Sequence, residues 1–231
     1  MEMLVRSLSL RRRAVKLFGS IVFGTVVACG PVSAGVSLPD PAEDMPRAQA
    51  KTIETAVFAG GCFWGIEAVF EHVKGVRKVT AGYSGGTAST AHYDEVSGGD
   101  TGHAESVQVE FDPSRVSYGT LLQVFFSVAL NPTELNRQGP DRGTQYRSVI
   151  FYGNDEQKKI ATDYIAQLTA AHAFAAPIVT QVVPLTAFYP AEAYHQHYYD
   201  LHPRNPYIVI NDAPKVAHLQ RLFPELYQAA L

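Results

Sequence analysis

Cysteine is scarce in this 231-residue chain, and its scarcity excludes several classes of protein. Cys29 lies near the N-terminus in a leader-like segment, so that Cys62 is the one thiol of the remaining chain. One thiol cannot form an internal disulfide, which excludes the disulfide-stabilised scaffolds. An excess of basic charge is also lacking, since 19 basic and 22 acidic residues give a net charge of −3. The sequence therefore gives no reason to expect nucleic-acid binding.

The chain lacks a hydrophobic run long enough for an ordinary membrane-spanning helix. The apolar run from Leu17 to Gly30 has 14 residues, whereas a spanning helix needs roughly 20. Basic residues precede this run and Val32-Ser33-Ala34 follows it, which is the order of regions in a secretory signal. We expect residues 1–34 to be an export signal, residues 35–52 a disordered linker, and residues 53–231 the functional domain.

Two refinements of the export signal stay open. Leu10-Arg11-Arg12-Arg13-Ala14-Val15-Lys16 resembles a twin-arginine signal, so that the chain has two candidate export routes. Val26-Val27-Ala28-Cys29 resembles a lipoprotein cleavage site, with Cys29 as the lipidated residue. We therefore expect an exported, periplasmic protein, either free or anchored through a lipid on Cys29. An uncleaved N-terminal anchor is the remaining interpretation.

The stretch around Cys62 is the strongest indication of chemistry. A strand-like run, Thr55 to Ala59, leads into Gly60-Gly61-Cys62-Phe63-Trp64-Gly65, and apolar residues at helical spacing follow from Ile66 to Val73. Cys62 is thus predicted at a strand-to-helix corner, where free N–H groups and the helix dipole favour a nucleophilic thiolate. The alternative is a small buried cysteine in a glycine-rich turn.

The rest of the chain predicts an α+β fold with a mixed or mostly antiparallel sheet and helices packed on it. Polar loops are expected over 84–102 and 136–145, and long polar loops often carry function. The tail is predicted to be irregular. Strands are expected over 76–83, 104–111, 148–152 and 178–183, and helices over 117–130, 154–173 and 192–200.

A nucleophilic cysteine needs partners, and two chemistries are open. A histidine base would make a Cys-His acyl transferase or hydrolase. An acid near an electrophilic sulfur or oxygen would instead support redox chemistry, in which the cysteine becomes a sulfenic acid. A non-catalytic exported lipoprotein is a third possibility. His195 and His197 are two residues apart, a spacing that does not put both on one helix face, so no metal site is predicted from them.

Candidate partners lie in the loops and at a strand end. Glu105 opens a predicted strand, where a partly buried carboxyl can be a general acid. Tyr93 and Tyr146 could donate phenolic hydrogen bonds, and Asp141 could hold a neighbouring site residue. Phe63 and Trp64 could form an apolar pocket for a methyl or thioether group. For each, an ordinary surface, turn or core role is the alternative.

Several segments carry a shared pattern in a fixed order: Gly61 to Gly65, Gly82 to Gly86, Gly102 to Glu105, Phe111 to Pro113, Asn131 to Thr133, Gln138 to Ser148 and Ala191 to Gln196. Together they resemble the peptide methionine sulfoxide reductases of type A, over about residues 54–212. The resemblance implies a two-layer fold with a ferredoxin-like core and reduction of methionine-(S)-sulfoxide, in proteins and free. It implies Cys62 as nucleophile, Glu105 as proton donor to the sulfoxide oxygen, Tyr93 and Tyr146 as hydrogen-bond donors, and Asp141 in the same site. Phe63 and Trp64 correspond to the pocket for the methyl group.

The sequence departs from many members of this family in one respect. They carry further cysteines near the C-terminus that resolve the sulfenic acid as a disulfide, and no cysteine follows Cys62 here. We expect the intermediate to be reduced by an outside thiol, from a thioredoxin- or glutaredoxin-like protein or a small thiol. The expected substrates are oxidised proteins and peptides. No metal or organic cofactor is expected, and a monomer is the default state.

Overall fold

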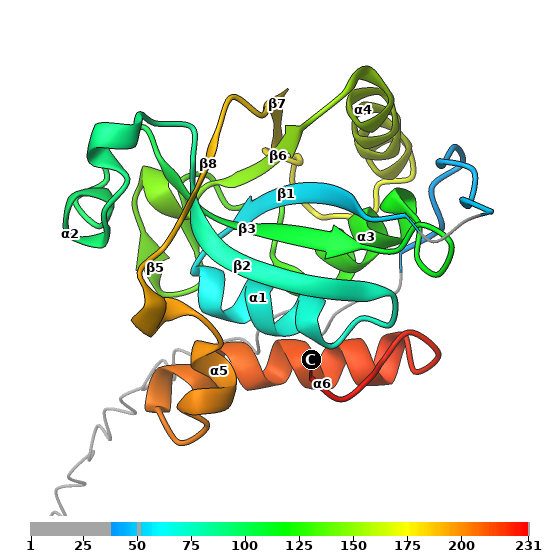
Figure 1. Cartoon of the computed structure of the whole chain (residues 1–231). Helices are drawn as coiled ribbons and strands as arrows, with labels where there is room; N and C mark the ends of the chain where they lie inside the picture. Colours follow the sequence, from blue (N-terminus) through cyan, green and yellow to red (C-terminus); the bar gives the residue numbers. More distant parts are fainter. Residues whose placement is uncertain (1–37, 50–51, 231) are drawn as a thin grey trace, which may run out of the picture. The chain divides into compact units, whose positions relative to one another are not determined.

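A six-stranded sheet organises the protein, as seen in a computed structural model that describes residues 38–49 and 52–230 (Figure 1). The strands lie in the order β7-β6-β1-β3-β2-β8, and neighbours are antiparallel except β6 and β7. The mixed sheet was predicted, whereas β8 was not. The strands are β1 (Glu54–Gly60), β2 (Val76–Ser84), β3 (Ala104–Phe111), β6 (Ser148–Tyr152), β7 (Gln181–Pro184) and β8 (Phe188–Pro190).

Four of these strands and two helical segments make a β-α-β-β-α-β unit. Helix α1 (Phe63–Glu71) connects β1 to β2, while α3 (Tyr118–Val124) and the π-helical turn η2 (Phe125–Ala129) lie between β3 and β6. The unit's strand order is β6-β1-β3-β2, so β3 lies between β1 and β2. The α+β class is confirmed, and this order agrees with the ferredoxin-like core that the resemblance implied.

The central strand β1 is buried on both faces of the sheet. Its side chains point alternately to the two faces, and those on one face pack against α1. Phe58 points into the main core, where its ring stacks on Phe70 of α1 and on Phe125 at 5.3 and 5.0 Å between centroids. Val57 and Ala59 point to a smaller cluster on the other face. Burial of each such aromatic side chain contributes about 1.5–3 kcal/mol. These core contacts therefore fix the position of α1 and of the chain at its start.

The predicted helix starts at Ser117 and Asn154 are confirmed. Ser117 Oγ accepts a hydrogen bond from the Thr120 backbone N–H at 3.2 Å. Asn154 Oδ1 accepts one from the Gln157 N–H at 2.8 Å, at the start of α4 (Asp155–Ala170). Each side chain satisfies a backbone donor that the first turn of a helix leaves free.

Two predictions for the C-terminal part are wrong. The helix expected over 192–200 is broken at His197, whose φ of 52° is left-handed, into η4 (Ala193–His195) and α5 (Tyr198–Leu201). The tail is also not irregular, because it forms the π-helical turn η5 (Ile208–Asp212) and α6 (Ala213–Leu222). Figure 1 shows α6 lying along α1. Pro214 in its first turn and the buried Val216 and Leu219 are the sequence features that indicate this helix.

Part of the segment predicted as a disordered linker lies on α3. Leu38 is buried, and its carbonyl oxygen accepts a hydrogen bond from Gln123 Nε2 at 2.7 Å. Asp44 Oδ1 accepts one from the Gly119 N–H at 2.7 Å, and its other oxygen accepts from Ser117 Oγ. Asp44 thus caps the first turn of α3, which gives residues 38–49 a fixed place. The prediction of an export signal over 1–34 falls outside the described residues.

Short elements occur inside the two predicted polar loops. In the first they are η1 (Ala88–Thr90) and α2 (Tyr93–Val96). In the second they are the hairpin β4 (Arg137–Gln138) and β5 (Asp141–Arg142), followed by η3 (Thr144–Tyr146). Tyr93, Asp141 and Tyr146 therefore lie on ordered elements.

Candidate active site

Cys62 lies at the junction between the central strand β1 and helix α1. Gly61, with φ 98°, turns the chain after β1, and Cys62 is the N-cap residue of α1. The Cys62 side chain makes no capping hydrogen bond, and the residue is 8% exposed. The predicted strand-to-helix corner is confirmed, and Cys62 packs in the core with only a small part of its surface reaching solvent.

The pKa of the Cys62 thiol is raised, which differs from the sequence-based expectation of a favoured thiolate. Burial raises its pKa well above the usual value, and the carboxyl groups of Glu105 and Asp212 raise it further. The Trp64 backbone N–H and Lys215 act in the opposite direction. The favourable field of the helix start is thus outweighed by burial and by acids that come from distant segments.

Of the two carboxyl groups that raise the pKa of Cys62, Glu105 has the larger effect. It is the second residue of β3 and is 2% exposed, and its Oε2 accepts a hydrogen bond from the Phe63 N–H at 3.0 Å. Burial raises the pKa of this carboxyl to about 8, and Asp141 and Asp212 contribute in the same direction. The Glu105 side chain therefore carries a proton at neutral pH and can give it to a group bound beside Cys62.

The phenol groups of Tyr93 and Tyr146 both lie near Cys62 and Glu105. Burial raises the pKa of both, and Glu105 and Cys62 are among the groups that raise them further. Both phenols thus lie within the electrostatic reach of the thiol and the acid, and both stay protonated as hydrogen-bond donors. Asp141 also faces this group, since it affects the pKa of Glu105 and Tyr146, and it accepts a hydrogen bond from the Tyr207 hydroxyl.

The two predicted pocket residues have different surroundings. Phe63 is fully buried and packs on Tyr83 and His195, at 5.9 and 5.0 Å between centroids. Trp64 is half-buried, stacks on Tyr198 at 3.7 Å and meets Tyr207 edge-on at 5.8 Å. Of the two, Trp64 is the one with an aromatic surface that a small apolar group could contact.

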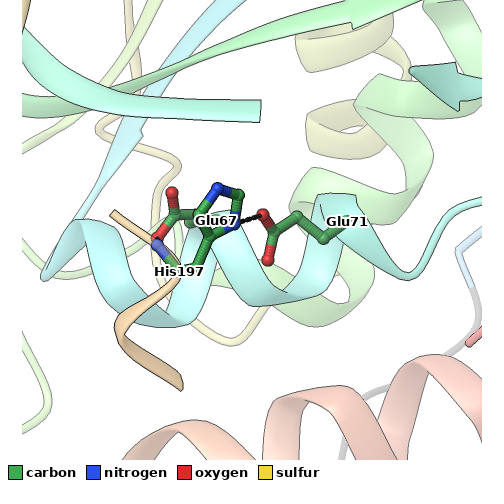
Figure 2. Close-up of side chains that lie close together, drawn as sticks. All are labelled: Glu67, Glu71 and His197. Carbon is green, nitrogen blue, oxygen red and sulfur yellow. Dashed lines mark hydrogen bonds and ion pairs between the residues drawn. The ribbon is translucent and has the colours of Figure 1, made fainter. Parts of the chain in front are cut away.

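His195 and His197 point to different partners, as their spacing predicted. Trp64 Nε1 donates a hydrogen bond to His195 Nδ1 at 3.2 Å, and burial lowers the pKa of His195. His197 instead lies beside Glu71 of α1, with its Nδ1 2.6 Å from Glu71 Oε1 (Figure 2). The structure does not bring this pair together as ligands of one metal ion.

Sequence reasoning missed Glu192, Tyr207, Asp212 and Lys215. Glu192 Oε1 accepts from the Tyr93 N–H at 3.0 Å, and Oε2 accepts from the Tyr83 hydroxyl at 2.8 Å, which fixes the start of α2. The other three lie in or beside η5 and α6, a segment predicted to be irregular. Recognition of the Pro214 helix start would have placed Asp212 and Lys215 one turn apart, but not against Cys62.

Asp212 and Lys215 pack against the first turn of α1. Their charged groups pair at 3.2 Å, and Asp212 is fully buried. A Cβ atom on Gly65 would lie 2.1 Å from Asp212 Oδ1 and 2.7 Å from Lys215 Nζ. A glycine at position 65 is thus what allows this ion pair to approach the helix that begins at Cys62.

We predict that Lys215→Met raises the pKa of Cys62, because it removes a cation and leaves Asp212 without its partner. Alkylation of Cys62 by iodoacetamide near pH 8 should slow about threefold or more. The measurement is the alkylation rate as a function of pH. Lys74→Met, just beyond the other end of α1, is the matched control, and equal curves for both variants would contradict the assignment.

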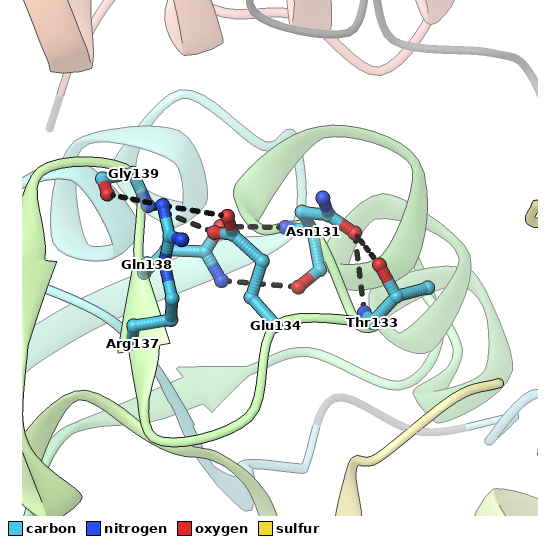
Figure 3. Close-up of polar contacts among 6 residues, drawn as sticks. All are labelled: Asn131, Thr133, Glu134, Arg137, Gln138 and Gly139. Carbon is cyan, nitrogen blue, oxygen red and sulfur yellow. Dashed lines mark hydrogen bonds and ion pairs between the residues drawn. The ribbon is translucent and has the colours of Figure 1, made fainter. Parts of the chain in front are cut away.

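The turn before Cys62 packs against the β4–β5 hairpin. Figure 3 shows the polar contacts that hold this hairpin. Gln138 makes two hydrogen bonds to the Asn131 backbone, accepting from N–H at 2.9 Å and donating to the carbonyl oxygen at 3.1 Å. Glu134 accepts from the Gly139 N–H and pairs with Arg137. A Cβ on Gly61 would lie 2.5 Å from Gln138 Cβ. The β4–β5 hairpin thus packs directly against Gly61, the glycine at which the chain turns.

Gly61→Ala should therefore destabilise the protein through both backbone strain and crowding, by about 2–4 kcal/mol in the free energy of unfolding. Gly139→Ala is the matched control, because Gly139 also has a positive φ, 56°, but has nothing within 4 Å of its Cβ position. It should cost only about 1–2 kcal/mol. Urea unfolding measures both, and an equal loss would refute the crowding at Gly61.

Together, the fold and this site define an α+β protein in which a buried thiol, Cys62, lies within the electrostatic reach of a buried carboxyl group, Glu105. A model of the peptide methionine sulfoxide reductase family matches residues 54–226. The chain belongs to this family, and it is an oxidoreductase that reduces methionine sulfoxide. The Cys-His hydrolase and the non-catalytic lipoprotein are thereby set aside.

Individual relatives agree with this assignment. Peptide methionine sulfoxide reductase MsrA 2 of Mesorhizobium japonicum is 60% identical over 183 residues, which are 79% of this chain and 94% of the relative. Among solved structures, reduced Mxr1 of Saccharomyces cerevisiae has 34% identity and a TM-score of 0.59, covering 69% of this chain and 91% of that one. Methionine sulfoxide reductase A of Corynebacterium diphtheriae has 32% identity and a TM-score of 0.58, with coverages of 74% and 88%.

Proposed function

We propose that Cys62 attacks the sulfur of methionine-(S)-sulfoxide while Glu105 protonates the oxygen. The observation that supports this most directly is the pairing of Glu105 with the helix that begins at Cys62, through the 3.0 Å bond from the Phe63 N–H. The sulfoxide oxygen is a poor leaving group until it is protonated. Glu105 holds a proton to about pH 8 and so can supply it.

The two phenols and the aromatic wall complete this mechanism. Tyr93 and Tyr146 remain protonated and can donate hydrogen bonds to the charge that develops on the oxygen, as fixed donors do in an oxyanion site. The substrate methyl group contacts Trp64, with Phe63 behind it in the core. Asp141 orients the site through its bond with Tyr207.

The sulfur–oxygen bond of the substrate breaks, and that oxygen forms a bond to the Cys62 sulfur. The oxygen takes its proton from Glu105, and the proton of the Cys62 thiol passes to Glu105 and restores its acid form. The methionine sulfur gains two electrons, the cysteine sulfur loses two, and the products are methionine and a cysteine sulfenic acid. An outside thiol then condenses with the sulfenic acid, releasing water and leaving a mixed disulfide. A second thiol reduces this disulfide and restores Cys62. The outside thiol is needed because no cysteine follows Cys62 in the sequence.

The reductant we propose is a thioredoxin- or glutaredoxin-like protein or a small thiol, and the substrates are oxidised proteins and peptides as well as the free amino acid. The basic and apolar leader supports export to the periplasm, with lipid attachment at Cys29 as the second form. Within residues 38–49 and 52–230, no helix is both long and apolar enough to cross a membrane. The mass of the mature N-terminus, measured from an exporting host, distinguishes these forms.

The test is incubation of the purified protein with each sulfoxide epimer and dithiothreitol. We expect complete conversion of the S epimer and no conversion of the R epimer, measured by chromatography of the methionine formed. Conversion of neither epimer, or of both equally, would overturn the proposal.

A further inference from the structure

A second cluster of ionisable side chains lies on α1, outside the group formed by Cys62, Glu105, Tyr93 and Tyr146 (Figure 2). Glu67 and Glu71 are four residues apart, so they share one face of the helix. His197, from the break between η4 and α5, lies between their carboxyl groups. One ligand atom from each of the three residues lies within 4.8 Å of the other two.

The two carboxyl groups are buried and only half satisfied. Each glutamate is 1% exposed. Glu67 Oε2 accepts from the His197 N–H at 3.0 Å, and Glu71 Oε1 lies 2.6 Å from His197 Nδ1. Their other oxygens, Glu67 Oε1 and Glu71 Oε2, are buried with no hydrogen-bond partner among the residues that the structure describes. Two buried carboxylates with spare acceptor atoms require a cation or protons to be stable.

His197 gives this cluster both a nitrogen ligand and access to solvent. Its side chain is 55% exposed, whereas that of Glu71 is 2% exposed, so an ion could enter past the imidazole and keep water ligands there. Two carboxylate oxygens and one imidazole nitrogen suit a borderline divalent ion such as Zn²⁺. With metal–ligand distances of about 2.0–2.2 Å, ligand atoms lie up to about 4.4 Å apart. The observed cluster needs only a small closure to meet this limit.

We propose that Glu67, Glu71 and His197 bind one divalent transition-metal ion of the zinc type. The ion would displace the proton between His197 and Glu71 and tie the η4–α5 connection to α1. It takes no part in oxygen transfer. Metal binding affects the substrate pocket through Tyr198, the residue after His197, because Tyr198 stacks on Trp64.

The test uses the full-length chain with Cys29 and Cys62 replaced by serine, so that no thiol competes for metal. Zinc chloride is added under isothermal titration calorimetry, and magnesium chloride, a hard ion, is the comparison. We expect one Zn²⁺ per chain, a rise in melting temperature, and a change in the fluorescence of Trp64, the only tryptophan. Mg²⁺ should bind far more weakly.

His197→Ala and Glu71→Gln should each weaken Zn²⁺ binding by more than about tenfold. His202→Ala is the matched control, since His202 is an exposed histidine that also contacts Tyr198, at 4.1 Å between centroids. It should bind as tightly as the parent. His197→Ala changes an exposed side chain, so it keeps the test valid if Glu71→Gln does not fold. No binding by the parent chain, which would mean that protons alone neutralise the cluster, overturns the proposal, as does undiminished binding by His197→Ala.

Discussion

Replacing Cys62 with serine should lower turnover of methionine-(S)-sulfoxide by more than about 10³-fold, whatever thiol is supplied. A serine hydroxyl is a far weaker nucleophile for sulfur than a cysteine thiol. The fold should remain, because serine is close in size to the cysteine that occupies this N-cap position and is itself a favourable N-cap residue. Circular dichroism and urea unfolding provide the check on folding, and the epimer assay gives the rate.

The unmutated enzyme should show the corresponding intermediate. With substrate and no reductant, its mass should rise by about one oxygen atom, and dimedone should trap the resulting sulfenic acid. The Cys62→Ser variant should show neither change. Turnover retained by that variant, or an internal disulfide in the oxidised enzyme, would contradict a mechanism with one reacting thiol.

Glu105→Gln should have the second largest effect, a loss of about 10²–10⁴-fold in kcat/KM. The glutamine oxygen can still accept from the Phe63 N–H, but its amide has no proton to transfer. In the parent enzyme kcat/KM should fall as pH rises through about 8, because Glu105 then loses the proton that it must donate. In the variant this fall should disappear, which a profile from pH 6 to 10 with thiol in excess would measure.

Glu105→Gln should also change how stability depends on pH. Burial raises the pKa of Glu105 from 4.5 to about 8, so between these values the folded chain holds a proton that the unfolded chain has released. The Glu105 contribution to the free energy of unfolding is therefore complete below about pH 4.5 and is lost as pH rises through about 8. The variant lacks this decline. Parallel curves for parent and variant would show that Glu105 is already ionised at neutral pH.

The local features of the site could be predicted from the sequence because they depend on near neighbours. A strand, two glycines and a helical run put Cys62 at a helix start, and the structure agrees. Glu105 opens a strand as its alternating pattern indicates. The ionisation of Cys62 was not predictable in this way. Its thiol pKa is raised by burial and by acids 43 and 150 residues away in the chain, Glu105 and Asp212, whose positions no local pattern contains.

The sequence alone determined the family and the α+β class, and it led us to propose Cys62 as the nucleophile and an outside thiol as the reductant. Each of these depends on residue identity, short-range periodicity or the absence of a later cysteine. Only the tertiary structure decided that Tyr207 and Lys215 join the site from the C-terminal helices, and that Glu67, Glu71 and His197 share a second cluster. Burial and charge–charge interactions act between atoms close in space, and folding brings such atoms together from segments that are far apart in the chain.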